Sequence, residues 1–316
     1  MALRVVDPGV RAEVQDLGRR GYQRHGLSVS GAADKYSLLC GNLLLGNPPG
    51  SAAIEATLFG LHVVMEQDCD VVVTGADLGL HVNGRRAPTW TLLQLKAGDA
   101  IRMTGGPYGC RAYLCVRGGI DVPEAFGSRA TDPVVGIGGW KGRPLQAGDV
   151  LPIGRAGAKG RRRTRWLHPD FVPEYPRQVE VRVILGPQAH RFPSDAVETM
   201  LSQPYTVTPR SDHMGCQLEG PRLTHLETAD LLSECISEGS IQVPASGQPI
   251  ILLAGRRGVG GYTKIATVIT VDIPKVAQAR PGDTLQFTAV SVEEAQALLF
   301  DQRRFFRIAR LWGELG

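Results

Sequence analysis

Polar and charged residues are concentrated in one glycine-rich stretch near the start of the chain, residues 15–55. Glycine tolerates positive φ angles at little cost, so closely spaced glycines let the backbone bend sharply and present polar side chains. Functional loops on rigid scaffolds often have this composition. A solvated surface crossover would have it too, so both interpretations stay open. The polar residues of the stretch include Asp16, Arg19, Arg20, Arg24, His25, Asp34, Asn42, Asn47 and Glu55.

Two side chains of this stretch are suited to chemistry. A planar guanidinium such as that of Arg19 binds a carboxylate or phosphate through two parallel hydrogen bonds. His25 can gain or lose a proton near neutral pH, which makes it a candidate acid or base. A lone histidine is more often a structural hydrogen-bonding residue, and that alternative remains for His25.

One helix can be placed in the stretch. Asp34 suits an N-cap, Gly46 suits the C′ position, and the prolines that follow prevent continuation, so we expect a helix over about 35–45. Its N-terminus carries partial positive charge and would suit an anionic ligand. Asn42 is expected on the polar face. The expected apolar face consists of Tyr36, Leu39 and Leu43, with Leu38 beside them.

A second glycine-rich segment, residues 258–264, is expected to form a loop between two strands. Its backbone N–H groups and Lys264 could hold a phosphate or a carboxylate. A tight hairpin is the structural alternative.

The composition excludes several classes of protein. The chain has 316 residues, of which 43% are hydrophobic and 21% charged, so it can bury a core and is not disordered overall. A net charge of +4 suits an anionic ligand but is too small to indicate nucleic-acid binding.

No apolar run approaches the roughly 18 residues of a membrane helix. The first residues lack the apolar core of a signal peptide. We therefore expect a cytoplasmic protein.

The cysteines and histidines do not have the spacing of a metal site. No two cysteines form a Cys-x-x-Cys pair, which favours buried free thiols over disulfides or metal ligands. The six cysteines are Cys40, Cys69, Cys110, Cys115, Cys216 and Cys235.

Short strands and turns dominate the rest of the chain. A Gly-Asp turn precedes an apolar segment three times, at 97–99, 147–149 and 281–283, and Asn83-Gly84 indicates a hairpin. A capping box beginning at Ser291 opens an amphipathic C-terminal helix, and a short helix is expected near residue 194. The strand signals lie at 70–75, 78–84, 91–95, 100–103, 111–116, 179–185, 241–244, 250–254, 264–271 and 284–290.

The chain is expected to divide into two subdomains. Six Lys and Arg residues fall in 155–165, and prolines follow them. Because aromatic residues are not interleaved with these charges, a solvated linker is favoured over a nucleic-acid-binding segment. The expected parts are a β-rich subdomain over 1–155 with the glycine-rich stretch and helix, a linker over 156–176, and a barrel subdomain over 177–316 with the terminal helix.

Complete nucleotide and biotin motifs are absent from the sequence. Residues 255–260 have the first half of a Walker A spacing, but Gly261 and Tyr262 follow where lysine and serine or threonine belong. No GxGxxG motif follows a strand, and no lysine lies in a Met-Lys-Met context. The chain therefore carries no covalently bound biotin of its own.

Several segments in a fixed order resemble the allophanate hydrolase subunit 2 or KipA family, which includes the C subunit of 5-oxoprolinase and part of the carboxyltransferase region of urea carboxylase. The segments span about residues 9–287. They are QDLGRRGYQRHGLSVSGAAD, GNLLLGN, AAIEATLFG, GGIDVPEAFGSRATD, GRPLQAGD, SDHMGCQLEGP, GSIQVPASGQPI and GGYTKIATVI.

The resemblance implies a mainly β protein with cyclophilin-like β-barrel architecture in two subdomains, a few short helices and a C-terminal helix. It also implies a KipI-like partner of the 5-oxoprolinase B type, a third protein of the A type, and a chain that is inactive alone. The implied reaction is the ATP-dependent opening of 5-oxo-L-proline to L-glutamate. Phosphorylation of the lactam oxygen would make a good leaving group, which requires ATP, Mg²⁺, donors to the phosphates and an acid or base.

We expect the following residues to form the site. Arg19, Arg129 and Lys264 would contact anions, and Asp16, Asp34 and Glu55 would orient the arginines or hold a metal ion, although no dedicated metal site is expected. The catalytic candidates are His25, Arg19 and Asp34. The candidates for binding substrate or nucleotide are Asp16, Asn42, Asn47, Glu55, Arg129, Gly260, Gly261, Tyr262 and Lys264.

The sequence departs from the family pattern at several positions. The family has Asp, Thr and Pro where this chain has Gly255, Val259 and Thr263, and Ser where it has Ala130. Arg256 and Arg257 are additional. Two other functions therefore remain open: a carboxyltransferase component that uses carboxybiotin from another chain and acts on a urea-like amide, and a non-catalytic regulator that binds a KipI-like protein.

Overall fold

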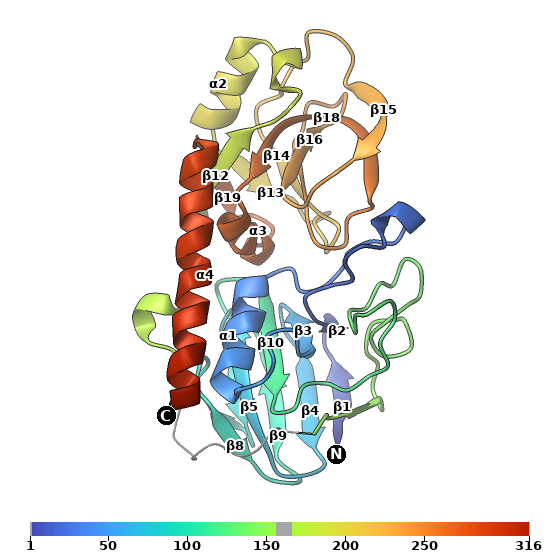
Figure 1. Ribbon diagram of the computed structural model, residues 1–316, viewed down its shortest axis with the longest axis vertical. Helices are drawn as coiled ribbons and strands as arrows, with labels where there is room; N and C mark the ends of the chain where they lie inside the picture. The colour runs from blue at the N-terminus through green and yellow to red at the C-terminus, as the bar shows by residue number, and fades with distance from the viewer. Residues whose placement is uncertain (1, 156–165, 316) are drawn as a thin grey trace. The chain divides into compact units, whose positions relative to one another are not determined.

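The computed structural model describes residues 2–155 and 166–315. It is mainly β, with 35% strand and 19% helix, as the sequence predicts. The chain divides into two compact units (Figure 1). The first unit comprises residues 1–20, 30–174 and 308–316, and the second comprises 21–29 and 175–307. The basic run at 156–165, with which the expected linker begins, lies outside the described residues.

Two antiparallel sheets form the first unit, in the orders β11-β1-β4-β9-β6-β7 and β2-β3-β10-β5-β8. Strand β10 is buried along its whole length, and helix α1 (Lys35–Leu45) packs against it and against β5. The strands are β1 (Ala2–Pro8), β2 (Arg11–Gln15), β3 (Ala53–Thr57), β4 (Leu61–Met65), β5 (Cys69–Gly75), β6 (Leu80–Val82), β7 (Arg85–Arg86), β8 (Leu93–Leu95), β9 (Ala100–Met103), β10 (Arg111–Val116) and β11 (Val150–Pro152).

Helix α1 (Lys35–Leu45) has the bounds and caps that the sequence predicts. The Asp34 carboxylate accepts a hydrogen bond from the Ser37 N–H at 2.9 Å, and Gly46 ends the helix with a φ of 68°. The predicted faces are wrong in part, because Asn42 is buried and Tyr36, Leu39 and Leu43 are only half-buried. The buried residues are Ser37, Leu38, Cys40, Gly41, Asn42, Leu44 and Leu45. Small and polar residues share the buried face with three leucines. Helix α1 lies very close to β10 at Gly41, where a Cβ would lie 2.5 Å from Cys115 Sγ.

A closed barrel of seven strands forms the second unit. Its sheet has the order β12-β19-β13-β14-β17-β16-β18, and β12 closes the ring by pairing with β18, while β15 extends beyond β18 as an edge strand. The pairing of β12 with β19 is parallel. The strands are β12 (Gln178–Leu185), β13 (Tyr205–Val207), β14 (Gly215–Glu219), β15 (Asp230–Cys235), β16 (Ser240–Val243), β17 (Ile250–Leu252), β18 (Val259–Val268) and β19 (Thr284–Ala289).

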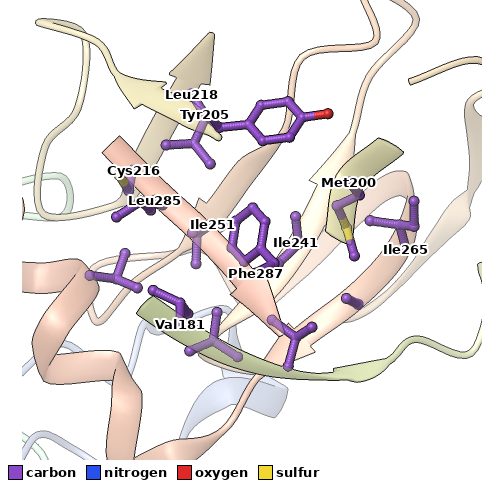
Figure 2. Packing of buried hydrophobic residues seen from close by; sticks show 14 of the residues in the cluster. Val181, Met200, Tyr205, Cys216, Leu218, Ile241, Ile251, Ile265, Leu285 and Phe287 are labelled. Atoms are coloured by element: carbon purple, nitrogen blue, oxygen red, sulfur yellow. The ribbon is translucent and has the colours of Figure 1, made fainter. Parts of the chain in front are cut away.

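The barrel interior is apolar. Figure 2 shows side chains from several strands, with Met200 of α2, directed toward a shared core around Phe287. Phe287 and Tyr205 are both at most 1% exposed, and their rings lie 6.1 Å apart. Burial of such side chains is the main favourable term in forming the barrel.

The helices of the described chain are few, as expected. The capping box is confirmed: Ser291 Oγ accepts from the Glu294 N–H at 3.1 Å, and Glu294 Oε2 accepts from the Ser291 N–H at 2.8 Å. The remaining helices are η1 (Gln23–His25), η2 (Pro169–Phe171), η3 (Ala189–Arg191), α2 (Ser194–Ser202), η4 (Thr270–Asp272), α3 (Ile273–Gln278) and α4 (Val292–Leu315).

The second glycine-rich segment is not the predicted loop or hairpin. Residues 259–268 form one continuous strand, β18, whose first part pairs with β15. Glycines 260 and 261 suit this strand because neighbouring segments of the same chain lie too close to leave room for a side chain. A Cβ on Gly260 would lie 2.7 Å from Gln242 Nε2 and 3.2 Å from Ile236 Cδ1.

Candidate functional site

Asp16 is a buried carboxylate that holds the backbone of the first unit together. Its Oδ1 accepts hydrogen bonds from the Gly18 N–H and from Ser128 Oγ, both at 2.7 Å. Its Oδ2 accepts from the Arg129 N–H at 2.6 Å. With 7% of its surface exposed, Asp16 joins the turn at residue 18 to the segment at 128–129.

Asp34 and Glu55 belong to one buried network around Tyr113. The Tyr113 hydroxyl donates to Glu55 Oε2 at 2.7 Å and accepts from the Asp34 N–H at 2.7 Å. Glu55 Oε2 also accepts from the Ala33 N–H at 3.0 Å, and Arg111 Nε lies 3.5 Å from Oε1. Burial, with a further contribution from the nearby Glu55 carboxylate, raises the pKa of Tyr113 well above its ordinary value. These contacts fix the entrance to α1.

The two asparagines and Arg129 also contact neighbouring chain segments. Asn42 Nδ2 donates to the carbonyl oxygens of Pro49 and Ser51, and its Oδ1 accepts from Asn47. Asn47 donates to the Val116 carbonyl at 2.8 Å and accepts from the Gly118 N–H at 2.9 Å. The Arg129 side chain donates to the Val122 carbonyl and pairs with Asp121 and Glu124.

Arg19 is the most deeply buried cation predicted for the site, with 1% of its surface exposed. Its Nη2 donates to the Ala130 carbonyl, and its Nη1 lies 3.8 Å from Asp132 Oδ2. Burial lowers the pKa of Arg19, while Asp132 and Asp16 oppose that effect. Arg19 belongs to the first unit, whereas the pocket described next belongs to the second.

A pocket of about 430 Å³ lies within the second unit, against β15, β16 and β18. Two lining residues, Arg256 and Lys264, are cations, and no lining residue in the described chain is acidic. Three hydroxyl groups and an amide add neutral donors and acceptors. The lining residues are Gln23, Pro187, Cys235, Ile236, Ser237, Ser240, Arg256, Lys264 and Thr267.

Both cations of the pocket are held by specific contacts. Lys264 is 5% exposed, and its Nζ forms an ion pair with Glu234 of the edge strand β15. A hydrogen bond from the Lys264 ammonium group lowers the pKa of Glu234. Arg256 is 8% exposed, and its guanidinium donates to the carbonyl oxygens of Ile236 and Leu253, both at 3.3 Å. Two buried cations bordering one cavity that also has hydroxyl and amide groups in its lining favour a small anionic ligand.

The predicted residues are thus separated into two groups. Asp16, Arg19, Asp34, Asn42, Asn47, Glu55 and Arg129 lie in the first unit, and His25, Gly260, Gly261, Tyr262 and Lys264 lie in the second. Of these, only Lys264 lines the pocket. His25 is exposed and belongs to the short helix η1, which contributes Gln23 to the pocket.

The sequence alone does not single out Gln23, Glu234 or Arg256 as site residues. For Arg256, the sequence shows only that this arginine is additional to the family pattern. That departure is the signal by which Arg256 could have been found. Gly255 has close neighbours here, since a Cβ would lie 2.7 Å from His213 Nδ1. The family's aspartate would therefore require His213 to move in this chain.

Metal clusters and membrane helices are both absent from the part of the chain that the structure describes. Within those residues, no group of three or more histidine, cysteine or acidic side chains could hold a metal ion. No described helix is long and apolar enough to cross a membrane.

Comparisons with known proteins agree with the fold and with the sequence blocks. A family described as "Carboxyltransferase domain, subdomain A and B" matches residues 25–289. The chain is 36% identical to the C subunit of 5-oxoprolinase from Escherichia coli over 96% of both chains, and 38% identical to that from Haemophilus influenzae over 93% of both. The crystal structure of K. lactis urea amidolyase matches 98% of this chain with a TM-score of 0.92 and 29% identity, and this chain spans 20% of that protein. The chain therefore belongs to the family of carboxyltransferase domains with subdomains A and B.

Proposed function

We propose that this chain is the C-type subunit of an ATP-dependent 5-oxoprolinase, which opens 5-oxo-L-proline to L-glutamate. The observation that carries the proposal is its similarity to two proteins that are named as the C subunit of 5-oxoprolinase, each matched over more than nine-tenths of its length. A subunit designated C implies others, and we propose a KipI-like partner together with an A-type protein in the cytoplasm.

The pocket in the second unit supplies groups that this reaction requires. The lactam is a poor electrophile, and transfer of the terminal phosphoryl group of ATP to its oxygen, with release of ADP, activates the carbonyl carbon. Water then adds to that carbon, and the C–N bond breaks as the nitrogen takes up a proton. A second water molecule releases phosphate from the resulting acyl phosphate and leaves L-glutamate. Both the substrate carboxylate and the phosphates are anionic, and preorganised cations stabilise such charge in a site that excludes water. We propose that Lys264 and Arg256 contact these anions and that His25 exchanges a proton with the substrate.

Magnesium would have to enter with the phosphates of ATP. The described residues offer no acidic cluster that fits a resident metal ion. We therefore assign no residue of this chain as a ligand of magnesium and derive no step from it.

The test is glutamate release from 5-oxoproline by the co-expressed subunits, measured by a coupled assay with and without ATP. We expect ATP-dependent release by the complex and none by this chain alone. Lys264→Met should lower turnover about ten- to a thousandfold. Lys96→Met is the matched control, because Lys96 forms an exposed ion pair with Asp68 in the first unit. Full activity of the purified chain alone would overturn its assignment as one subunit of a larger enzyme.

The second candidate is a carboxyltransferase component. The family description and the 0.92 TM-score with urea amidolyase favour it. It predicts carboxyl transfer from a carboxybiotin on another chain to a urea-like amide. Transfer by the reconstituted subunits together with a biotin carboxylase, without glutamate release from 5-oxoproline, would select this candidate.

A further inference from the structure

We infer that the outer edge of strand β15 is a docking site for an extended, basic segment of another subunit, which adds a strand beside β15. The inference rests on the proposed function, because it requires this chain to work as one subunit of a larger enzyme. It adds the surface that holds the partner and the chemistry of the partner's segment.

The first argument is that one side of β15 has no neighbouring strand in the part of the chain that the structure describes. Strand β15 lies at the end of its sheet and pairs with β18 alone (Figure 1). Its attachment to β18 is fixed at both ends. The Thr263 N–H donates to the Ala229 carbonyl at 3.0 Å, and the Ile236 N–H donates to the Gly258 carbonyl at 3.2 Å. A strand held in this way presents its other row of N–H and C=O groups to an added strand.

The second argument is the exposure of Leu232 in the middle of β15. In the pairing with β18, the three residues 231–233 bulge opposite Gly261 alone, and bulges at sheet edges can re-aim a side chain. Leu232 is 95% exposed, whereas the next most exposed large hydrophobic residue among the described side chains is 63% exposed. Covering this leucine with another surface would remove an unusually large apolar area from water.

The third argument is the charge around Leu232, which decides between the possible occupants. Residues 227–238 contain four carboxylates and no lysine, arginine or histidine. Glu227 and Asp230 are exposed. A second copy of this chain that paired through the same edge would bring carboxylates against carboxylates, which is unfavourable. A segment with lysine or arginine on both sides of an apolar residue instead complements the carboxylates and covers Leu232.

The same strand connects this edge with the pocket. Glu234 forms the ion pair with Lys264, and Cys235 lines the pocket. Gln188 donates to Glu234 at 2.9 Å from outside the strand. A segment docked on β15 therefore holds in place the residues that border one side of the pocket. The partner can in this way influence turnover without supplying a catalytic group there.

The test compares the full-length chain alone with the complex that it forms when co-expressed with the proposed partner subunits. Hydrogen exchange of the amides of residues 231–235, followed by mass spectrometry, should be about tenfold slower in the complex. N-ethylmaleimide should also modify Cys235 more slowly there. Both changes are expected because the added strand covers the edge and pairs with its backbone.

Two variants test the chemistry of the docking site. Leu232→Asp and Asp230→Lys should each weaken the complex about tenfold, because the first removes the apolar contact and the second sets a cation against a basic segment. Affinities are measured by surface plasmon resonance, and melting temperatures verify the fold. The matched control is Val134→Asp, which alters a 57% exposed apolar residue in a turn of the first unit and should leave the affinity unchanged.

Two results would overturn the inference. One is equal exchange and equal Cys235 reactivity in the free chain and the complex, with wild-type affinity in both variants. The other is a chain that dimerises alone and is made monomeric by Leu232→Asp, since the occupant would then be a second copy. A complex that releases glutamate while β15 stays as exposed as in the free chain contradicts the inference and leaves the proposed function intact. A complex in which β15 is protected but which releases no glutamate does the reverse.

Discussion

Buried polar residues of the first unit make contacts that fix the backbone, as the contacts of Asp16 and Arg19 illustrate. Each oxygen of the Asp16 carboxylate is bonded to a neighbouring turn, and Arg19 lies between a carbonyl oxygen and Asp132. Residues with such contacts contribute mainly to the stability of the fold. Their substitution should therefore change the free energy of unfolding, whether or not it also changes turnover.

Arg19→Lys should lower the free energy of unfolding by about 1–3 kcal/mol. A lysine ammonium cannot reach both Ala130 and Asp132 with the geometry of a guanidinium. Arg20→Lys is the control, because Arg20 is exposed in the next position. Thermal and urea unfolding of the two variants would measure the difference. If Arg19→Lys keeps wild-type stability and loses turnover, Arg19 acts in catalysis.

The pair formed by Arg182 and Asp272 should make the second unit sensitive to acid. Burial raises the pKa of Asp272, but hydrogen bonds from the side chain and N–H of Arg182 outweigh it and leave the pKa below its ordinary value. The ionised carboxylate therefore stabilises the fold above the unfolded pKa of about 4, and this contribution is lost as pH falls through the lower folded pKa.

Asp272→Asn should consequently be less stable than wild type at pH 7, with a difference that shrinks below about pH 4. Urea denaturation at a series of pH values would measure this. Asp301→Asn, at an exposed position of α4, should show no such convergence. If the unfolding free energies of wild type and Asp272→Asn differ by the same amount at every pH, Asp272 contributes through packing alone.

Cys235 should be the fast-reacting thiol among the six. It is exposed and lines the pocket, whereas Cys40, Cys110, Cys115 and Cys216 are buried. Burial raises the pKa of Cys69 to about 11 and that of Cys115 to about 12, which lowers their thiolate fractions. The structure thus limits the sequence prediction of buried thiols to four of the six residues.

We expect N-ethylmaleimide to modify the native chain first at Cys235, as mass spectrometry of peptides would show. Cys235→Ser should abolish that fast reaction and leave turnover intact, because serine is close to cysteine in size and keeps a polar group at this position. Loss of turnover in Cys235→Ser, with fold and assembly preserved, would contradict this expectation.

At the scale of elements, helix α1 depends on the close approach of Gly41 to β10. Gly41→Ala should lower stability by about 1–3 kcal/mol, because its new methyl group would overlap Cys115 Sγ. The variant Gly41→Ala/Cys115→Ala removes the obstructing sulfur and should recover part of the loss. A double-mutant cycle by chemical denaturation measures this coupling. If the changes in unfolding free energy of the two single variants simply add in the double variant, the two positions are not coupled. The new methyl group then does not overlap the Cys115 sulfur.

Elements with local signals could be predicted from the sequence. The caps of α1 and α4 lie within a few residues of the helices that they begin or end, and β9 and β10 have mainly apolar segments with the observed bounds. Strands β1 to β4, β11 and β13 to β15 were missed, because they are specified chiefly by pairing with other segments of the chain. The number of strand signals was enough to indicate a mainly β protein, whereas the barrel architecture was predicted from the family resemblance.

The burial of polar residues and the pocket could not be predicted in the same way. Asn42 is polar, yet it is buried because its amide bonds to two carbonyl oxygens beyond the helix. Glycines 260 and 261 suggested a loop, but a neighbouring strand determines that this segment is extended. Lys264 and Arg256 border one cavity only after the barrel closes, so no local pattern relates them.

At the scale of the whole molecule, closure of the barrel depends on strands far apart in sequence. Strand β12 pairs in parallel with β19, and the same strand also pairs with β18. A chain that ends after residue 283 should therefore fail to form a cooperative second unit, whereas one that ends after residue 307 retains every barrel strand. Circular dichroism and thermal unfolding would distinguish them. A cooperative barrel in the shorter chain would show that β19 is dispensable.

The late arrival of β19 also affects how the protein is made. During translation, β12 emerges while residues 186–283 and its parallel partner are still to be synthesised. At about 5–20 residues per second, its edge remains open for about 5–20 seconds. An unpaired apolar strand is prone to association with other chains. The nascent chain should therefore depend on chaperones until the ribosome has passed residue 289, and codon changes that slow this interval should increase aggregation without altering the protein.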